Sequence, residues 1–398
     1  MPSPTARLER VRLLKFGKHA NATDVTADAA TQYFLEPRNG MTLGTNQAKL
    51  ERDLVRGDNE IYASINGVKD TSLGFTLELR GISGGAGDST SAAYTTKSQL
   101  GSLLDVVCGV NGNNDSGETT DAADAGTGTI VTMDAATSLS DQNGVLVKGT
   151  ASGTYQAREV VATAGDDVII CRTLTQADGT ADSPAESEVA FASASWFLDA
   201  DNANHTHAFF IAEGDSFTRK VYGAMSNLTM AFGNAEIGTA AFEFQGSDWT
   251  DAGNGGTLSF SAQAAGGPIV GTDSEIHLGS DRFDLIETSI DFGLEMSPKV
   301  NLDSTNGLSG FKVIRQMPKI TCKFYFNEAL FATLQGETTQ DLLLQLGSTA
   351  GSCIALRMPA ADARDVVHSV TDGIETIDCV FHGTRPAAGN GALRIHMF

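Results

Sequence analysis

The chain has 398 residues, with 49 acidic and 27 basic side chains and a formal net charge of -22 at pH 7. A surface this negative repels phosphate, which argues against tight binding to a nucleic-acid backbone. The length suffices for two units or one unit with insertions, and no apolar run approaches the ~18 residues of a membrane-spanning helix.

Five basic residues crowd the first eighteen positions, opposed only by Glu9. The segment lacks the continuous apolar stretch of a secretory signal, so we expect a protein made and used without export. Two interpretations stay open: an arm that docks on the acidic surface of another copy, or a solvated, frayed terminus. The candidate arm contacts are Arg7, Arg10, Arg12, Lys15 and Lys18.

Alternating apolar and polar residues predict antiparallel strands with one buried face. The stretch 72–80, SLGFTLELR, places its leucines and Phe75 on one side and Thr76, Glu78 and Arg80 on the other. The 43 glycines and 20 phenylalanines also favour strands joined by tight turns. The same period recurs in 240–246, 288–296, 319–326 and 376–383.

Two helices are expected. In 98–109 the apolar residues recur at helical spacing, with Ser98 able to cap the start and Gly109 able to end it. The second is predicted near 327–346, where Asn327 can cap and Leu330, Leu334 and 342–344 supply apolar surface.

The region 110–200 is predicted to be a small all-β insertion. Two polar stretches, 111–128 and 176–188, have the composition of loops. Four strand candidates lie between them, with turn signals at Asn143-Gly144 and Gly165-Asp166. The candidates are 129–133, 145–148, 157–163 and 167–174.

Two segments of the chain resemble each other in sequence. FEFQGSDWTDAGNG at 242–255 aligns with CVFHGTRPAAGNG at 379–391, with one gap. An alternating strand followed by a helix precedes each motif. We therefore predict a mainly β fold made of two tandem copies of a β-plus-helix unit, over 1–255 and 256–398, with the first enlarged by the insertion.

Gly81-Ile82-Ser83-Gly84-Gly85 matches the G-x-S-x-G pattern of a hydrolase nucleophile elbow. That elbow needs a buried parallel strand before the serine and a helix directly after it. Here the preceding strand alternates and the predicted helix starts some fifteen residues later. The context therefore favours a loop, and we predict that the protein is not an enzyme.

Other candidate sites are also weak. His205 and His207 form H-x-H, which can ligate zinc, but no third ligand is placed nearby, so a surface pair is expected. The glycine and serine spacings match no phosphate-binding loop, and 111–118 departs from a calcium loop. We predict no cofactor and no metal. The five cysteines, expected as buried free thiols, are Cys108, Cys171, Cys322, Cys353 and Cys379.

Several segments, taken in order, resemble the tail tube (major tail) proteins of long-tailed bacteriophages. LLKFGKHANATDVTADAATQYFLEP at 13–37 is similar to the opening strand and arm of that family, and 73–109 to its strand, glycine-rich loop and short helix ending in Cys-Gly. YGAMSNLTMAFGNAEIGTAAFEFQG at 222–246 resembles its closing strand pair. NGLSGFKVIRQMPKITCKFYF and the ending GALRIHMF resemble its second unit.

The resemblance implies antiparallel β-sandwich or half-barrel units, each flanked by a helix, that contribute to a shared ring β-barrel. Three duplicated chains would form a pseudo-sixfold ring, and rings would stack into a tube with other tail proteins at its ends. DNA would pass through without specific binding, in a virion assembled in the bacterial cytoplasm. The glycines implied to form an assembly loop are Gly81, Gly84, Gly85 and Gly87.

Two alternatives stay open. Another β protein of the virion, such as a tail terminator or a capsid decoration protein, would form discrete assemblies instead of tubes. A carbohydrate-binding or adhesive β module would use the loops 111–128 and 176–188, although these contain no Trp, Tyr or Phe.

Overall fold

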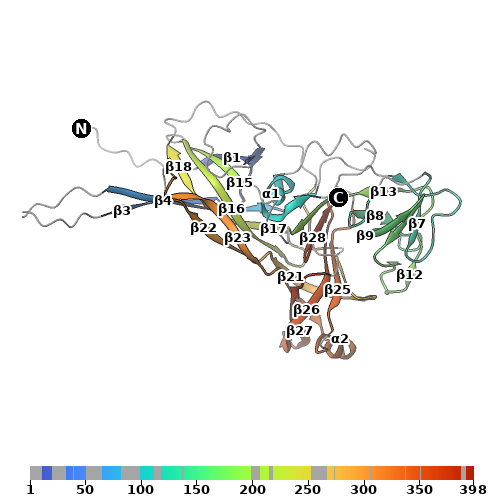
Figure 1. Cartoon of the computed structure of the whole chain (residues 1–398). Helices are drawn as coiled ribbons and strands as arrows, with labels where there is room; N and C mark the ends of the chain where they lie inside the picture. Colours follow the sequence, from blue (N-terminus) through green and yellow to red (C-terminus); the bar gives the residue numbers. More distant parts are fainter. Residues whose placement is uncertain are drawn as a thin grey trace, which may run out of the picture.

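The chain is mainly β, as the alternating patterns predict, with two helices among the described residues, α1 (Gln99–Cys108) and α2 (Glu328–Leu334). Figure 1 shows an elongated molecule with a long hairpin at one end and the insertion at the other. The structure is a computed structural model that describes residues 11–19, 33–38, 40–50, 65–81, 99–111, 118–135, 139–198, 207–214, 218–251, 267–272, 274–304, 307–336, 338–349, 351–386 and 391–398.

The strands of the first half pair antiparallel in the order β2-β1-β15-β16-β17-β4-β3. A short strand, β18, also pairs with the first residues of β16. The strands are β1 (Val11–His19), β2 (Tyr33–Leu35), β3 (Met41–Leu50), β4 (Ile65–Glu78), β15 (His207–Gly214), β16 (Thr218–Phe232), β17 (Thr239–Gly246) and β18 (Asp248–Asp251).

The strands of the second half pair antiparallel in the order β20-β19-β25-β26-β27-β24-β21. The last strand, β28, pairs with the first residues of β26, and the β22–β23 hairpin extends from β21 and β24. The strands are β19 (Glu275–Leu278), β20 (Asp281–Phe283), β21 (Leu285–Asp291), β22 (Leu294–Val300), β23 (Leu308–Gln316), β24 (Lys319–Tyr325), β25 (Gln340–Leu346), β26 (Ile354–Thr371), β27 (Ile374–Gly383) and β28 (Arg394–Met397).

The two halves join where the end of β16 pairs with β21. Residues 229–232 of β16 lie opposite 288–291 of β21, and residues 229–231 also pair with β17. The pairing therefore runs without a break through β3-β4-β17-β16-β21-β24-β27-β26, which we call the eight-strand sheet.

One face of the eight-strand sheet is apolar and forms the main core. Phe75, Phe242, Phe244, Phe324 and Phe381 are among its buried side chains. The residues that alternate with them point to the opposite face, which we call the open face, and these are half-buried or exposed. They include Thr42, Thr76, Thr229, Thr239, Glu243, Glu287, Ser289, Thr321, Lys323 and Asp378.

The insertion leaves the main body through two adjacent strands, β5 (Gly109–Asn111) and β14 (Ala194–Leu198), and β14 also pairs with β28. Its valines and leucines form a separate core. The insertion contains a sheet in the order β6 (Glu118–Thr119), β13 (Val189–Ala192), β8 (Gly144–Lys148), β9 (Tyr155–Ala164), β10 (Asp167–Ile170) and β7 (Ile130–Thr132), and a hairpin of β11 (Leu174–Thr175) and β12 (Ala181–Asp182).

Most predicted elements are confirmed, including the first helix and the four insertion strands. Asn327 caps α2, because its Oδ1 accepts a hydrogen bond of 3.1 Å from the Leu330 amide. The prediction of one helix over 327–346 is wrong, since 340–346 is strand β25. Its leucines 342–344 are all buried and lie between two apolar layers, which hides the period of the strand. The predicted loops 111–128 and 176–188 contain short strands, β6 and β12.

Replacing Phe244 by alanine should lower the free energy of unfolding by about 3–5 kcal/mol, the usual cost of a cavity of that size in a core. The Phe244 ring is 1% exposed and lies 4.6 Å from the ring of Phe210. Urea denaturation measures the effect, with Tyr325→Ala as control because Tyr325 is 49% exposed on the open face. Equal midpoints for the two variants would contradict this account of the core.

Candidate functional site

Gly81 is the one residue of the predicted assembly loop that lies among the described residues. It is buried three residues beyond the end of β4, and its amide donates to the Gly267 carbonyl over 3.2 Å. A Cβ at this position would lie 2.2 Å from the Gly351 carbonyl oxygen, so only glycine fits this close backbone approach. Ser83, Gly84, Gly85 and Gly87 lie outside the described residues.

Three of the five predicted basic arm residues lie in a paired strand of the first half. Arg12, Lys15 and Lys18 are part of β1, which pairs with β15. Arg7 and Arg10 lie outside the described residues.

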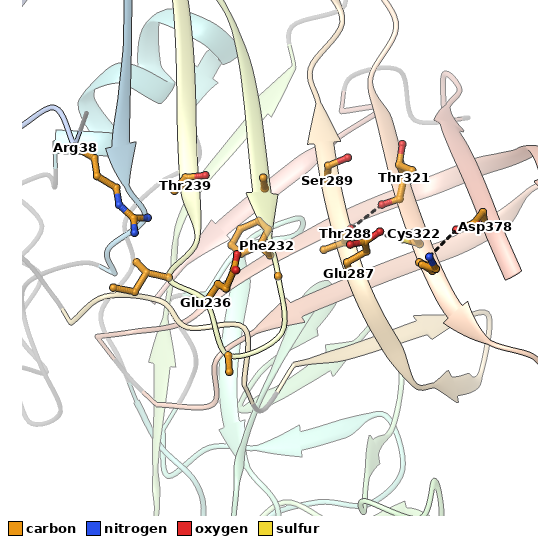
Figure 2. A pocket seen from close by; sticks show the side chains of 15 residues that line it. Arg38, Phe232, Glu236, Thr239, Glu287, Thr288, Ser289, Thr321, Cys322 and Asp378 are labelled. Atoms are coloured by element: carbon orange, nitrogen blue, oxygen red, sulfur yellow. Dashed lines mark hydrogen bonds and ion pairs between the residues drawn. The ribbon is translucent and has the colours of Figure 1, made fainter. Parts of the chain in front are cut away.

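An open hollow of about 650 Å³ lies on the open face, where β21, β24 and β27 meet the turn between β16 and β17 (Figure 2). Its charges have both signs, and the Lys323 ammonium lies 4.0 Å from the Asp378 carboxylate. Burial raises the pKa of the Cys322 thiol to about 12, so the thiol stays protonated and is not a nucleophile. The charged and sulfur-bearing lining residues are Arg38, Glu236, Glu287, Cys322, Lys323 and Asp378.

A polar cluster with the residue types of a serine hydrolase lies where the insertion meets the second half. Ser195 Oγ lies 2.9 Å from His396 Nδ1, and His396 Nε2 lies 3.3 Å from Glu159 Oε2. A serine, a histidine and a carboxylate in this order form the catalytic triad of many hydrolases. This cluster was not predicted from the sequence.

The burial of this cluster argues against catalysis. Ser195, His396 and Glu159 are each 1% exposed, so a substrate carbonyl has no path to the serine oxygen. The Glu159 carboxylate also accepts hydrogen bonds from the guanidinium groups of Arg357, over 2.6 Å, and Arg394. Burial alone would raise the pKa of Glu159, but the His396 hydrogen bond and the positive charges outweigh it and lower the pKa.

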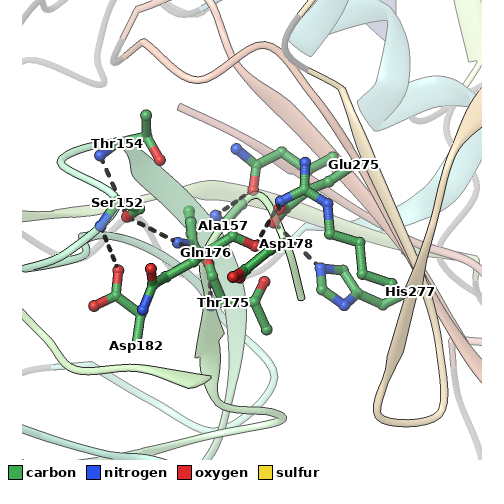
Figure 3. Close-up of polar contacts among 12 residues, drawn as sticks. Ser152, Thr154, Ala157, Thr175, Gln176, Asp178, Asp182, Glu275 and His277 are labelled. Carbon is green, nitrogen blue, oxygen red and sulfur yellow. Dashed lines mark hydrogen bonds and ion pairs between the residues drawn. The ribbon is translucent and has the colours of Figure 1, made fainter. Parts of the chain in front are cut away.

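One buried and one partly buried ion pair also connect the insertion to the second half. Arg158 Nη1 lies 2.9 Å from Glu275 Oε1, and Arg172 Nη2 lies 2.8 Å from Asp341 Oδ2. The Ala157 amide donates to Gln345 Oε1 over 2.6 Å. Figure 3 shows Ala157, Glu275 and His277 in this group of polar contacts. We call these contacts, with those of Glu159, the polar joint.

An apolar cluster accompanies the polar joint and fixes which side of the main body the insertion covers. Leu146 and Ala157 of the insertion pack on Leu343 and Ala355. The neighbours of Leu343, Leu342 and Leu344, point the other way, into the main core. Strand β25 thus separates the insertion from the core.

One signal in the sequence could have revealed the polar joint. Arg158 and Glu159 are consecutive charges inside strand β9, between Ala157 and the valines 160 and 161, so they point to opposite faces and one must enter an interior. A buried charge needs a partner, which predicts a contact with another part of the chain.

No metal site is evident among the described residues, where no group of three or more His, Cys, Asp or Glu side chains is arranged to hold an ion. His207 Nε2 lies 3.3 Å from the Phe311 carbonyl oxygen, and His205 lies outside the described residues. All five cysteines are free thiols, four of them buried as predicted, while Cys171 is half-buried. None of the described helices is long and apolar enough to cross a membrane.

Comparison with known proteins adds no assignment: no protein-family model matches the chain, and no curated protein matches it in sequence.

Replacing Glu159 by glutamine should lower the free energy of unfolding by about 3 kcal/mol, because it leaves the buried Arg394 guanidinium without its counter-charge. Chemical denaturation measures the loss. The control is Glu188→Gln, since Glu188 pairs with Lys148 at the surface and is screened by solvent. An unchanged denaturation midpoint in Glu159→Gln would contradict a structural role for the polar joint.

Acid should destabilise the protein through Glu275. Burial opposes its ionisation, but the Arg158 charge and the His277 ring outweigh this and lower the pKa to about 2. A lowered folded-state pKa stabilises the fold above the ordinary value, about 4.5, and the contribution is lost as the pH falls through about 2. Between pH 5 and pH 2 the wild type should lose about 3 kcal/mol more stability than Glu275→Gln. Equal losses in parallel denaturation series would contradict the assignment.

Proposed function

We propose that this chain is a structural protein of a bacteriophage tail, whose copies form rings that stack into a tube through which DNA passes. The observation that carries the proposal is the eight-strand sheet, which has one face in the core and one polar, uncovered face. A sheet with these properties can form part of the wall of a wide channel.

The strand order supports an internal duplication. Both halves share one pairing order, and each places a helix after the same strand, α1 after β4 and α2 after β24. The registers also agree: Phe244 lies opposite Leu73 in the first half, and Phe381, which aligns with Phe244 in the repeated motif, lies opposite Ile320. A duplicated chain needs only three copies to form a pseudo-sixfold ring.

The size of the sheet is compatible with a channel for DNA. Three copies would contribute twenty-four strands, and strands about 4.8 Å apart give a barrel with a backbone circumference of at least ~115 Å. A barrel with this circumference has a bore wider than a DNA duplex. Barrels of 16–18 strands already enclose aqueous channels.

The chemistry of the open face supports passage without binding. Most of its cations are paired with carboxylates: Arg80 Nη2 lies 3.1 Å from Glu78, Arg364 Nη2 lies 2.7 Å from Asp362, and Lys323 lies 4.0 Å from Asp378. Paired cations are poorly available to phosphate. The carboxylates of Glu243, Glu287 and Asp291 on this face outnumber the cations of Arg38 and Lys319, and on this basis we propose an acidic lumen.

The position of the insertion supports an exterior location. It packs on β25, which lies across the core from the eight-strand sheet, so it does not cover the open face. In the proposed ring the insertion therefore decorates the outside and leaves the bore open. Other tail proteins would bind the tube ends, in a virion assembled in the bacterial cytoplasm.

Negative-stain electron microscopy of the purified full-length protein tests the proposal. We expect long hollow tubes of uniform bore, because contacts between stacked rings repeat without closing. Discrete single rings would instead indicate a terminator, and a protein that stays monomeric at high concentration would refute ring formation.

A further inference from the structure

We propose that strand β3 of one copy pairs antiparallel with residues 367–370 of β26 in a neighbouring copy, with Leu43 opposite His368. This inference rests on the proposed ring assembly and adds to it the two surfaces and their register. The partner that pairs with each of these strand edges is therefore a second copy of this chain.

Both strands have an open edge. Among the described residues β3 pairs with β4 on one side, and residues 367–371 of β26 pair with β27 on one side. Their other sides present unpaired backbone amides and carbonyls, which another strand can satisfy. They are also the two ends of the eight-strand sheet, so joining them between copies continues that sheet into a ring.

The chain contains one copy of the same contact within itself, the pairing of β16 with β21. In that internal contact Met230 lies opposite Ile290. Strand β26 occupies in the second half the position of β16 in the first, and β3 occupies in the first half the position of β21 in the second. The two open edges are therefore the counterparts of two strands that already pair.

The pairings with β17 and β27 identify the residue of β26 that corresponds to Met230. Met230 lies opposite Ala240, and His368 lies opposite Ile377. Ala240 and Ile377 stand at the same distance from the repeated Phe-x-Gly motif, at 244–246 and 381–383. His368 is thus the counterpart of Met230.

The same reasoning identifies the counterpart of Ile290 on β3. Ile290 lies opposite Ile320, and Leu43 lies opposite Leu73. Ile320 and Leu73 correspond, because they lie opposite the matching Phe381 and Phe244. Leu43 is thus the counterpart of Ile290, which places it opposite His368 of the next copy.

This register also pairs Thr42 with Ser369, Gly44 with Val367 and Met41 with Val370, and the side chains suit it. Val367 and Val370 are 52% and 64% exposed in the single chain, although they lie in a regular strand. Val370 would be covered by Met41, which already packs at the border of the core. Gly44 leaves room for the Val367 side chain.

Disulfide trapping tests the register in the full-length protein. Residues directly opposite in antiparallel strands have Cα atoms about 4.5–5.5 Å apart, within reach of a disulfide. We expect Thr42→Cys with Ser369→Cys to form covalent oligomers under oxidation, seen by non-reducing electrophoresis, while each single variant stays uncrosslinked. The matched control joins Thr42→Cys to Val367→Cys, a diagonal pair about 7–8 Å apart that should crosslink far less.

The outcomes separate this inference from the proposed function. Rings or tubes in which only the control pair crosslinks would overturn the register, and assemblies in which neither pair crosslinks would overturn the two surfaces. In both cases the tube proposal would stand. A wild-type protein that forms no assembly would overturn both.

A charge placed at the proposed contact gives a second test. Val370→Asp should leave a folded protein that sediments as a monomer, because a carboxylate would face Met41 and the border of the core in the closed ring. Val161→Asp is the control, since Val161 is similarly exposed, at 48%, but lies on the insertion. Tubes formed by Val370→Asp at the wild-type level would overturn the inference.

Discussion

Backbone amides and carbonyls at the edge of a β-sheet need partners, and this requirement governs how the chain is arranged. Strand β16 meets it on both sides near each of its ends: its first residues pair with β15 and β18, and its last with β17 and β21. One long strand thereby belongs to two layers around the core and joins the two halves. Among the described residues the two ends of the eight-strand sheet, β3 and the last residues of β26, have no strand partner on their outer sides, and these are the edges at which we propose contacts between copies.

The polar joint holds the insertion against the second half. This contact is needed because the insertion follows helix α1 of the first half but packs on strands of the second. Burying charges such as Glu159 and Arg158 costs desolvation energy, which their partners offset without a large net gain. Their contribution is orientation: each carboxylate fits only where its guanidinium partners lie. The neighbouring apolar contacts of Leu146 and Leu343 bury hydrophobic surface, but they fix the orientation of the insertion less specifically than the ion pairs do.

The sequence predicts the strands that have one polar and one apolar face, such as 72–80 and 319–326, because their periodicity is visible. It does not predict β25, whose leucines 342–344 are buried on both faces. The polar joint is equally hidden, since Glu159 meets Arg357 and Arg394 at separations of 198 and 235 positions. Contacts at such distances are determined by the fold as a whole and leave no local pattern.

A channel wall of the proposed kind places weak demands on sequence, which can explain why the two halves share a strand order although only a short motif is visibly repeated. The core face needs apolar side chains of suitable volume, and many combinations provide them. The open face needs only to lack unpaired cations that would bind phosphate. Threonine, serine or an ion pair such as Lys323–Asp378 meets this requirement equally well. By contrast, the choice of residues at the two proposed pairing edges is restricted by backbone geometry and by facing residues such as Gly44 and Val367. Selection for assembly should therefore act most strongly there.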